Sequence, residues 1–595
     1  MKFFTVFIFL VVLIGSSKAQ YQVKSSYLLN PTLAIGYVDS CASFWLHAYD
    51  STYGGFYTNM DKTPIQYSAW GTQKNLQTQS RDAYGFVRAY QMTGNELYLF
   101  KARQALTFMY AHAWDNVNGG WYWELDKQGN HTSNTTKDAF HQHYALLGPT
   151  AFFEATRDST QWAWAMKGYA NNEAKLWDSR PQYFGYYDLP NETWSTKTGK
   201  SFNSTVDAIT THLLHNYLMT GSSTYSTRML QIVDNIMNHF VASMPAQKIG
   251  FVEGYDANWV ASPTDTMTIM GHILKTAWCL CRVNELFPDA NYITTAKSLF
   301  NHVYTNGYDK QLGGPYKDFS RTHGQMLMWG IADTAKAWWQ MEQAVTSGLF
   351  LYRATGDASY LKVADETLTF FMKFFVDHVN GEVYENRTRY GGQAWGEQKG
   401  DGNKGGYHSI ELGYYTYLYG SFFVNKQPFA LYYNFPVAAA ERTISLTPIE
   451  IALNTYHIKE VTRNGVAYND FNGGTKTVHI AANDGGKFKV TFELNSSTGI
   501  AANTSPVPQT FELKQNYPNP FNPTTVIRYE LPKTGHVVLR IFDMMGKEVS
   551  TLVDEVKQAG SYQTEFNASH LASGVYLYQI ESNGFMAVKK MLLLK

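Results

Sequence analysis

Seven polar side chains suited to proton transfer or charge stabilisation recur along the chain, one or two in each of six sequence repeats. They are Arg81, His141, His143, His212, His272, Glu342 and His408. An imidazole exchanges protons near neutral pH, and a guanidinium or carboxylate beside it holds charge or orients the ring. A single helical histidine is most often structural. Several at a similar depth in successive repeats predict that the side chains meet in one acid–base site.

The repeat is marked by a short turn sequence. It occurs at residues 92–95, 155–158, 219–221, 287–289 and 354–357, which places successive copies 63, 64, 67 and 68 residues apart. Each copy is expected to end one amphipathic helix and begin the next. Glycines before aromatic residues fall in mid-unit, at 54–57, 119–122, 185–187 and 313–316, and predict a tight hairpin there.

Each unit is therefore predicted to contain an outer helix, a glycine–aromatic loop, an inner helix and a short turn. Six units fit between about residues 30 and 424, with the polar residues on the inner helices. Hairpins of similar length bury their apolar faces by closing into two concentric rings, an (α/α)6 barrel. An open solenoid is the alternative, although it normally has more uniform repeats and polar caps.

The predicted fold class is multidomain. We expect a barrel over residues 20–424, a small β-sandwich over 425–495, a linker over 496–509 and a C-terminal β-sandwich over 510–595. The β-sandwich over 425–495 is predicted from short β-rich runs separated by Asn-Gly and Asp-Gly-Gly turns. The small β domain is expected to pack against the barrel, with carbohydrate binding as the alternative. The linker is rich in Ser, Thr, Ala and Pro.

Composition narrows the possible partners and the compartment. The 595 residues carry 49 basic and 49 acidic side chains, so the chain lacks the net positive charge typical of nucleic-acid binding. Residues 1–19 combine a basic start, a short apolar stretch and a small-x-small site, as in a secretory signal peptide, and no later run predicts a membrane span. The aromatic content of 16% suits sugar platforms or simple core filling. A disulfide between Cys279 and Cys281 is not expected.

The C-terminal residues resemble the sorting domain of the bacterial type IX secretion system. The similarity covers the whole tail and includes Tyr-Pro-Asn-Pro-Phe-Asn-Pro over 517–523, Asp-Met-Met-Gly over 543–546 and Ser-Gly-Val-Tyr over 573–576. This resemblance implies type IX secretion machinery as a partner. It also implies passage through the periplasm and outer membrane, followed by release or attachment at the cell surface.

Residues 30–424 resemble the N-acylglucosamine 2-epimerase and cellobiose 2-epimerase family. Five short motifs carry the similarity, in the same order along the chain. They are Thr-Gln-Ser-Arg over 78–81, Thr-His-Leu over 211–213, Gly-His-Ile-Leu over 271–274, Trp-Trp-Gln-Met-Glu over 338–342 and Gly-Asn-Lys-Gly-Gly-Tyr-His over 402–408.

The resemblance implies removal of a proton from carbon 2 of an open-chain sugar and its return to the opposite face. His272 and His408 match the two histidines that exchange this proton, and Arg81 would stabilise the enediolate oxygen. His212 would support the substrate or ring opening, and Glu342 would orient a histidine or bind a hydroxyl. The positions expected to contact substrate are Lys275, Trp338, Tyr407 and His143. Neither a metal nor an organic cofactor is required.

Two residues depart from the family pattern. Lys275 stands three residues after His272, where many such epimerases have glutamate, and Thr210 stands two before His212, where cellobiose epimerases have asparagine. Lys275 is expected either to engage an anionic or oxidised sugar or to form an ion pair. The substrate therefore does not follow from the family alone.

Three functions remain open at this point. The first is a sugar 2-epimerase or aldose–ketose isomerase, which share an enediol. The second is a glycoside hydrolase or polysaccharide lyase on the same barrel type; a hydrolase needs two carboxylates roughly 5–10 Å apart, for which Glu342 and Glu411 are the candidates. The third is a non-catalytic sugar-binding protein. Because an exported monosaccharide epimerase would lose its product by diffusion, an oligosaccharide is the expected substrate.

Overall fold

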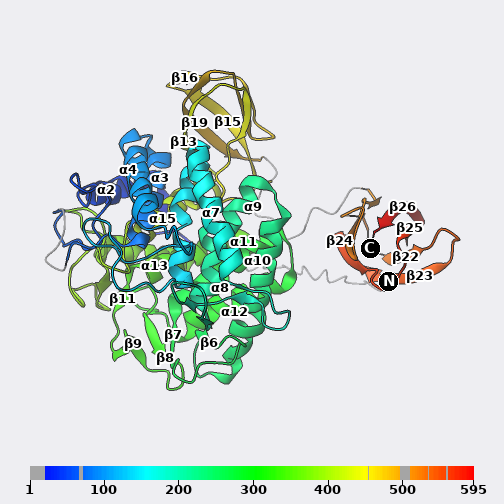
Figure 1. The fold of residues 1–595 in the computed structure, drawn as a ribbon, viewed down its shortest axis with the longest axis horizontal. Helices are drawn as coiled ribbons and strands as arrows, with labels where there is room; N and C mark the ends of the chain where they lie inside the picture. Colours follow the sequence, from blue (N-terminus) through cyan, green and yellow to red (C-terminus); the bar gives the residue numbers. More distant parts are fainter. Residues whose placement is uncertain are drawn as a thin grey trace, which may run out of the picture. The chain divides into compact units, whose positions relative to one another are not determined.

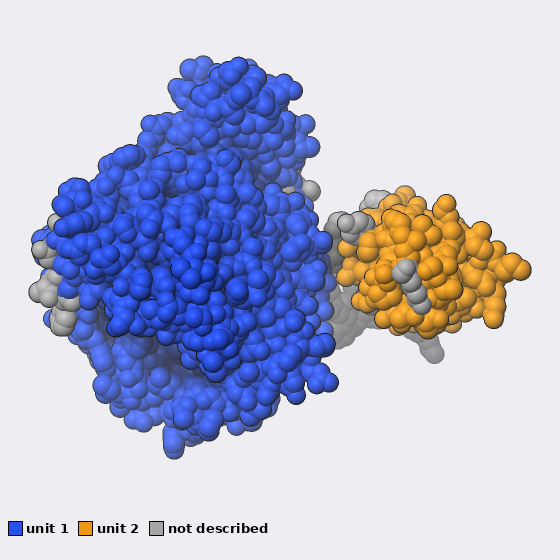
Figure 2. Space-filling view, in the orientation of Figure 1, with its two compact units in different colours: residues 1–500 blue, residues 501–595 orange. Residues whose placement is uncertain are grey.

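The structure is a computed structural model that describes residues 21–65, 71–452, 454–495, 510–516, 518–533, 535–557 and 560–594. The predicted signal peptide and the linker at 496–509 lie outside the described residues. The chain divides into two compact units, residues 1–500 and 501–595, coloured separately in Figure 2. No helix among the described residues is both long enough and apolar enough to cross a membrane.

Helices of the first unit alternate between an outer and an inner ring (Figure 1). The outer helices are α2 (Leu33–Leu46), α4 (Glu96–His112), α7 (Ser159–Lys175), α10 (Ser223–Asn235), α12 (Ala290–Asn306) and α14 (Ala358–Phe374). The inner positions hold α3 (Leu76–Thr93), α5 (Ala139–Tyr144) with α6 (Leu147–Thr156), α8 (Phe202–Ala208) with α9 (Leu214–Thr220), α11 (Met270–Leu286), α13 (Trp338–Thr355) and α15 (His408–Tyr419). Each inner segment contacts the next, and α15 returns to α3, so the inner ring is closed. The predicted helical barrel is confirmed.

The repeated turn sequence works as a joint between an inner helix and the next outer helix. Gly94, Gly221 and Gly356 end inner helices in the left-handed conformation, where a residue without Cβ has no steric penalty. One residue later, a polar side chain caps the outer helix; Asn95, for example, accepts the Leu97 N–H at 3.1 Å. Arg157 adopts the same left-handed conformation without being glycine.

Burial distinguishes the two rings. Nearly every residue of α3 is buried, including its polar ones, whereas α4 buries a single stripe from Tyr98 to Met109. A helix surrounded on all sides has no solvent face, so its polar side chains need partners inside the protein. The inner helices therefore bring polar groups together along the barrel axis.

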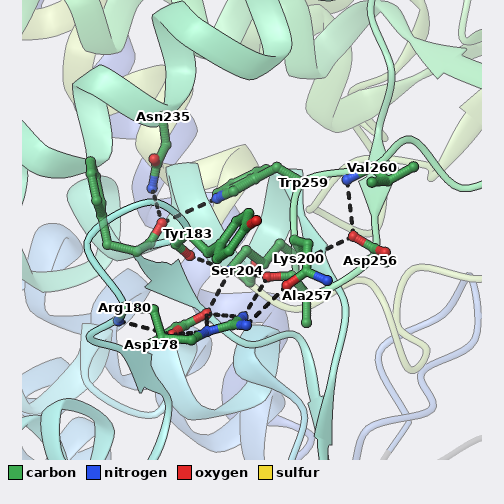
Figure 3. A network of polar contacts seen from close by, with 12 residues as sticks. Asp178, Arg180, Tyr183, Lys200, Ser204, Asn235, Asp256, Ala257, Trp259 and Val260 are labelled. Atoms are coloured by element: carbon green, nitrogen blue, oxygen red, sulfur yellow. Dashed lines mark hydrogen bonds and ion pairs between the residues drawn. The ribbon is translucent and has the colours of Figure 1, made fainter.

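A buried lysine–aspartate pair, here called the Lys–Asp clamp, closes the glycine–aromatic loop in five of the six units. The pairs are Lys74–Asp50 at 2.7 Å, Lys137–Asp115 at 2.5 Å, Lys200–Asp178 at 2.9 Å, Lys336–Asp309 at 3.2 Å and Lys399–Asp377 at 2.8 Å. In each clamp the ammonium also bonds backbone carbonyls; Lys200, for example, donates to the Ala257 carbonyl at 2.6 Å (Figure 3).

The fourth unit departs from this pattern. Lys200 and Lys336 each stand two residues before an inner helix, and the corresponding residue before α11 is Thr268. The Thr268 hydroxyl accepts the Phe251 N–H at 3.3 Å. In place of a clamp, the loop that precedes His272 contains Asp265, which pairs with Arg321 at 2.7 Å and accepts the Glu253 N–H at 2.8 Å.

The chain then forms two small antiparallel sheets that belong to the same compact unit as the barrel. One has the order β13 (Phe429–Ala438), β19 (Asp484–Leu494), β15 (Tyr456–Arg463), β16 (Val466–Ala467). The other has the order β14 (Arg442–Ser445), β18 (Thr477–Ile480), β17 (Phe471–Asn472). Their side chains continue the core of the barrel. That the two sheets stack as a sandwich remains a prediction.

The segment between β14 and β15 enters the end of the barrel near the C-termini of the inner helices. The Glu450 carboxylate binds Arg88 of α3 at 2.5 Å and accepts the Tyr414 hydroxyl of α15 at 3.3 Å. Its carbonyl accepts the Tyr419 hydroxyl at 2.9 Å. Residues 446–455, here called the plug, thus link the small β domain to the inner ring.

The second unit also contains two antiparallel sheets. One has the order β20 (Glu512–Leu513), β21 (Thr524–Leu531), β24 (Gly560–Asn567); the other has the order β23 (Glu548–Lys557), β22 (Gly535–Phe542), β25 (Gly574–Ser582), β26 (Phe585–Leu593). Residues of both sheets share one apolar core, separate from that of the barrel. A sandwich arrangement is again a prediction.

Candidate active site

A cavity of about 620 Å³ opens near the N-terminal ends of the inner helices. Side chains from all six inner positions line it, including Arg81, His141, Asp207, His272, Trp338 and His408. Four of the seven side chains expected to converge therefore do so, namely Arg81, His141, His272 and His408. Hydrophobic and aromatic walls with a few polar groups are the usual composition of a small-molecule site.

His272 has a fixed orientation in this cavity. Its Nδ1 lies 2.8 Å from Glu253 Oε2, and its ring stacks on Phe202 with the centroids 3.7 Å apart. Glu253 is itself anchored, because its Oε1 accepts the Ile269 N–H at 2.8 Å. Burial raises the pKa of the Glu253 carboxyl, and the nearby imidazole opposes this rise. With Nδ1 bound to Glu253, Nε2 is the nitrogen left for substrate.

His408 has a similar arrangement on α15. Its Nδ1 lies 3.2 Å from Glu342 Oε2, and Glu342 Oε1 accepts the Thr346 hydroxyl at 2.6 Å. Burial lowers the pKa of His408 well below its usual value, and the positive charges of Arg81, Lys275 and Lys404 lower it further. His408 is therefore neutral at neutral pH and able to accept a proton.

Trp339 contacts both histidines. The centroid of the indole lies 5.4 Å from the His272 ring and 6.1 Å from the His408 ring. Trp339 also lines the cavity. Two imidazoles, each with a carboxyl group at Nδ1, therefore border one cavity and contact one tryptophan.

Arg81 brings a positive charge to the same cavity. Its guanidinium donates to the Asn403 carbonyl at 2.6 Å and lies 4.1 Å from the Tyr144 ring centroid. The buried Nε has no hydrogen-bond partner among the described residues. The arginine thus retains capacity to donate to an anionic oxygen in the cavity.

Lys275 forms an ion pair, one of the two alternatives considered for it. Its ammonium lies 2.5 Å from Asp207 Oδ1, with both side chains almost fully buried, and 3.3 Å from the Tyr144 hydroxyl. Burial alone would lower the pKa of Lys275, but Asp207 outweighs this effect and raises it. Both members of the pair line the cavity, so Asp207 neutralises the positive charge of Lys275 there.

Glu342 and Tyr407 lie behind the cavity wall rather than in it. Glu342 contacts His408 as described above. The Tyr407 ring is buried 4.3 Å from the His408 ring and 5.1 Å from the Tyr84 ring, measured between centroids. Trp338, by contrast, does line the cavity.

His143 and His212 are not placed to contact substrate, which corrects the expectation for both residues. Their fully buried rings lie 5.5 Å apart, and the rings beside them are Tyr186 and Tyr169, not the cavity. His212 sits in a π-helical turn, Ile209–Leu213, between α8 and α9. The histidine of the second unit that lines the cavity is His141, because residues two apart on a helix point to different sides.

Three residues that position the site were missed in the sequence. Glu253 lies in the loop before α11, outside the repeated motifs, and nothing in the local sequence marks it. Phe202 is the first residue of α8, and Asp207 lies near the end of the same helix. The unusual Lys275 was the available signal for Asp207, because a buried lysine requires a counter-charge.

The fold is a helical barrel, and its cavity brings together histidine, arginine and carboxylate side chains. The sequence profile of the N-acylglucosamine 2-epimerase family matches residues 55–411, and the chain belongs to this family. It is thereby a carbohydrate epimerase or isomerase. The Secretion system C-terminal sorting domain profile matches residues 515–594. This type IX sorting tail indicates export to the cell surface or the medium.

The similarity of this chain to known proteins covers the barrel. The chain is 21% identical to a cellobiose 2-epimerase of Bacteroides fragilis over 354 residues, covering 57% of this chain and 86% of the relative. It is 19% identical to a D-mannose isomerase of Marinomonas mediterranea, covering 64% and 95%. The solved structure of a cellobiose 2-epimerase from Spirochaeta thermophila has the same fold, with a TM-score of 0.59, 20% identity and coverage of 67% and 100%.

Proposed function

We propose that this protein is an exported epimerase or aldose–ketose isomerase that moves one proton of a reducing sugar between two histidines. The observation that carries the proposal is the pair of imidazoles, His272 and His408, bordering one cavity with a carboxylate at each Nδ1. A proton transfer on both faces of one carbon needs two such groups, each in a defined tautomer.

In the proposed reaction, neutral His408 removes the proton from carbon 2 of the open-chain sugar. The C–H electron pair forms the C1–C2 double bond, and the carbonyl electrons move to O1. Arg81 stabilises the resulting enediolate oxygen by charge-assisted hydrogen bonds. His272, whose Nδ1 is bound to Glu253, then donates a proton from Nε2 to the opposite face of carbon 2 for epimerisation. Donation to carbon 1, after proton movement between the oxygens, gives the ketose instead.

Hydrolysis is the second candidate because carboxylates also line the cavity. Asp138, Asp188 and Asp207 are all present in its wall. However, Asp138 is paired with His141 at 2.7 Å and Asp207 with Lys275, whereas burial raises the pKa of Asp188 to about 6. A hydrolase uses one protonated acid with one free carboxylate. The ion pairs of Asp138 and Asp207 favour the proton-transfer proposal.

Incubation with glucose, mannose, cellobiose and mannobiose in D₂O tests the proposal. Deuterium at carbon 2 of the epimeric aldose, read by NMR, is expected for an epimerase, and deuterium at carbon 1 of the ketose product for an isomerase. Cleavage of the disaccharides without exchange would replace the proposal by hydrolysis. Binding without either reaction would leave a sugar-binding protein.

Two variants make the test specific. His272→Asn and His408→Asn are each expected to lower the exchange rate by about 10²–10⁴-fold, the usual contribution of a general acid or base. His47→Asn, on the exposed end of outer helix α2, is the matched control and should leave exchange unchanged. Exchange that survives in both cavity variants would contradict the assigned roles.

A further inference from the structure

A tryptophan occupies the tip of a hairpin at the cavity. Strands β9 (Met326–Met328) and β10 (Ile331–Ala332) pair with Met328 opposite Ile331, leaving Trp329 and Gly330 as a two-residue turn. Both turn residues have positive φ, 52° and 82°. A turn of this kind is normally Asn-Gly, and a bulky side chain in the left-handed region is strained.

Two other left-handed tryptophans in this chain are stabilised by packing. Trp194 and Trp259 are only 5% and 8% exposed. Their indole N–H groups donate to the Asn118 carbonyl at 3.0 Å and to the Phe184 carbonyl at 3.2 Å; the second contact is drawn in Figure 3. For these two residues, burial and a hydrogen bond explain why a tryptophan is retained.

Trp329 has neither of these compensations. It is 47% exposed and lines the cavity, and its indole N–H has no hydrogen bond to any described residue. Backbone strain that neither burial nor a side-chain hydrogen bond offsets is typical of positions that contact a ligand. The large exposed ring is therefore better explained by something that binds against it.

The ring is also held in place. Lys317 Nζ lies 3.6 Å from its centroid, and that lysine is buried and paired with Asp318 at 2.6 Å. The Trp329 backbone N–H donates to the same carboxylate at 3.2 Å. Because a cation already fixes the ring on one side, the ring loses little conformational entropy when a ligand packs on its remaining surface.

We propose that Trp329 is a sugar-stacking platform for a unit of an oligosaccharide that lies beyond the unit placed between His272 and His408. The inference rests on the proposed function and specifies its substrate as a chain that enters reducing end first. The histidine side chains are 14% and 8% exposed, so the reacting unit lies deep and Trp329 at the rim. A cavity of about 620 Å³ lies well within the range that holds ligands larger than one hexose.

Sugar chain length is the variable that tests the platform. The probes are glucose and mannose with their β-1,4-linked di- and trisaccharides, measured by carbon-2 exchange in D₂O. The wild-type kcat/KM is expected to rise from mono- to oligosaccharide. Trp329→Asn is expected to lower kcat/KM for the oligosaccharides by about tenfold and to leave the monosaccharide value within about twofold.

The choice of asparagine keeps the experiment interpretable. Asn-Gly is the preferred sequence for this turn, so Trp329→Asn retains the hairpin while removing the ring, and its melting temperature should not fall. Trp395→Ala is the matched control: this tryptophan also has positive φ and is 41% exposed, but its indole N–H binds Asp333 at 2.6 Å and it does not line the cavity. Trp395→Ala should leave the chain-length preference intact.

Binding separates failure of the platform from failure of the proposed reaction. In the His272→Asn/His408→Asn protein, calorimetric titration with the trisaccharides should still show about tenfold weaker binding when Trp329→Asn is added. If Trp329→Asn weakens trisaccharide binding but the wild type shows no carbon-2 exchange, only the proposed reaction is contradicted and the platform stands. The platform is overturned if oligosaccharides bind no better than monosaccharides, if none binds, or if Trp329→Asn weakens all probes equally.

Discussion

At the scale of single residues, His408 is kept neutral by its surroundings. Burial and the positive charges of Arg81, Lys275 and Lys404 all disfavour its imidazolium form. A neutral imidazole has a nitrogen lone pair that can accept a proton. We therefore assign His408 as the base in the forward direction.

Replacing Glu253 tests whether it positions His272. In Glu253→Gln a neutral amide replaces the carboxylate 2.8 Å from Nδ1, so the tautomer and orientation of the ring are less well fixed and kcat should fall. The fall should be smaller than the roughly 10²–10⁴-fold expected for loss of the histidine itself. A wild-type kcat in Glu253→Gln would show that the carboxylate only packs.

Lys275 is expected to matter for stability through its pairing with Asp207. In Lys275→Met a buried carboxylate loses its counter-charge, which costs about 3–5 kcal/mol of unfolding free energy. The double variant Lys275→Met/Asp207→Asn removes both charges and should recover most of that loss. Urea unfolding of the two variants measures the difference. Equal destabilisation by both would mean that the pair is not a mutual counter-charge.

At the scale of elements, the Lys–Asp clamps close the ends of the hairpins. In Asp50, burial would raise the pKa, but the hydrogen bonds from Lys74 and Tyr57 prevail and lower it to about 2. The pKa values of Asp115, Asp178, Asp309 and Asp377 are lowered as well. A lowered folded-state pKa contributes stability that is present above the unfolded value of about 3.9 and is lost as the pH falls through the folded value.

Acid unfolding of the barrel should therefore begin below about pH 4 and steepen toward pH 2. Lys74→Met removes one clamp cation, so the Asp50 carboxyl protonates more readily and the acid transition should move to higher pH. Circular dichroism across the pH range measures the shift. Lys101→Met, on outer helix α4 and outside the clamps, is the control and should leave the transition in place.

Particular residues show how far the sequence determines this site. Arg81, His272 and His408 were predictable because they recur at one depth in a repeat and match family motifs. The choice between His141 and His143 was not, because it depends on where the short α5 helix breaks before α6. The clamps were visible in principle, as lysines at 74, 137 and 200 spaced by 63 residues, but each aspartate partner lies more than twenty residues away in sequence.

Tertiary partners set the rest of the site. Glu253 reaches His272 from a loop of irregular length, and Asp207 becomes important only because Lys275 on the neighbouring inner helix α11 pairs with it. The left-handed tryptophans have no distinct local signature, since buried Trp259 and exposed Trp329 differ only in what surrounds them. Contacts between distant segments cannot be derived from periodicity alone.

At the scale of the whole molecule, the plug makes the small β domain part of the barrel, whereas the sorting tail has its own core. Arg88 on the barrel axis is shared between Glu154 at 2.7 Å and Glu450 of the plug at 2.5 Å. The first unit should consequently unfold as one cooperative body, barrel and small β domain together. The tail should unfold separately.

Calorimetry of the full chain is expected to show two transitions. Glu450→Ala leaves the buried Arg88 with one counter-charge fewer, and should destabilise the first unit by about 3–5 kcal/mol while leaving the tail transition unchanged. Glu548→Ala, on exposed β23 of the tail, is the control and should leave the first-unit transition unchanged. A separate third transition that responds to Glu450→Ala would show that the small β domain folds independently.

The clamps have a consequence for how such an enzyme can diversify. In each clamp, a lysine that precedes an inner helix binds an aspartate that follows the preceding outer helix. The loop between the glycine turn and the lysine is therefore held at both of its ends. The hairpin that carries Trp329 lies in such a loop, between Gly314 and Lys336. Insertions in such a loop change the residues at the rim of the cavity and leave the residues at its base in place. Evolution can therefore change substrate binding one loop at a time while the proposed catalytic residues stay fixed.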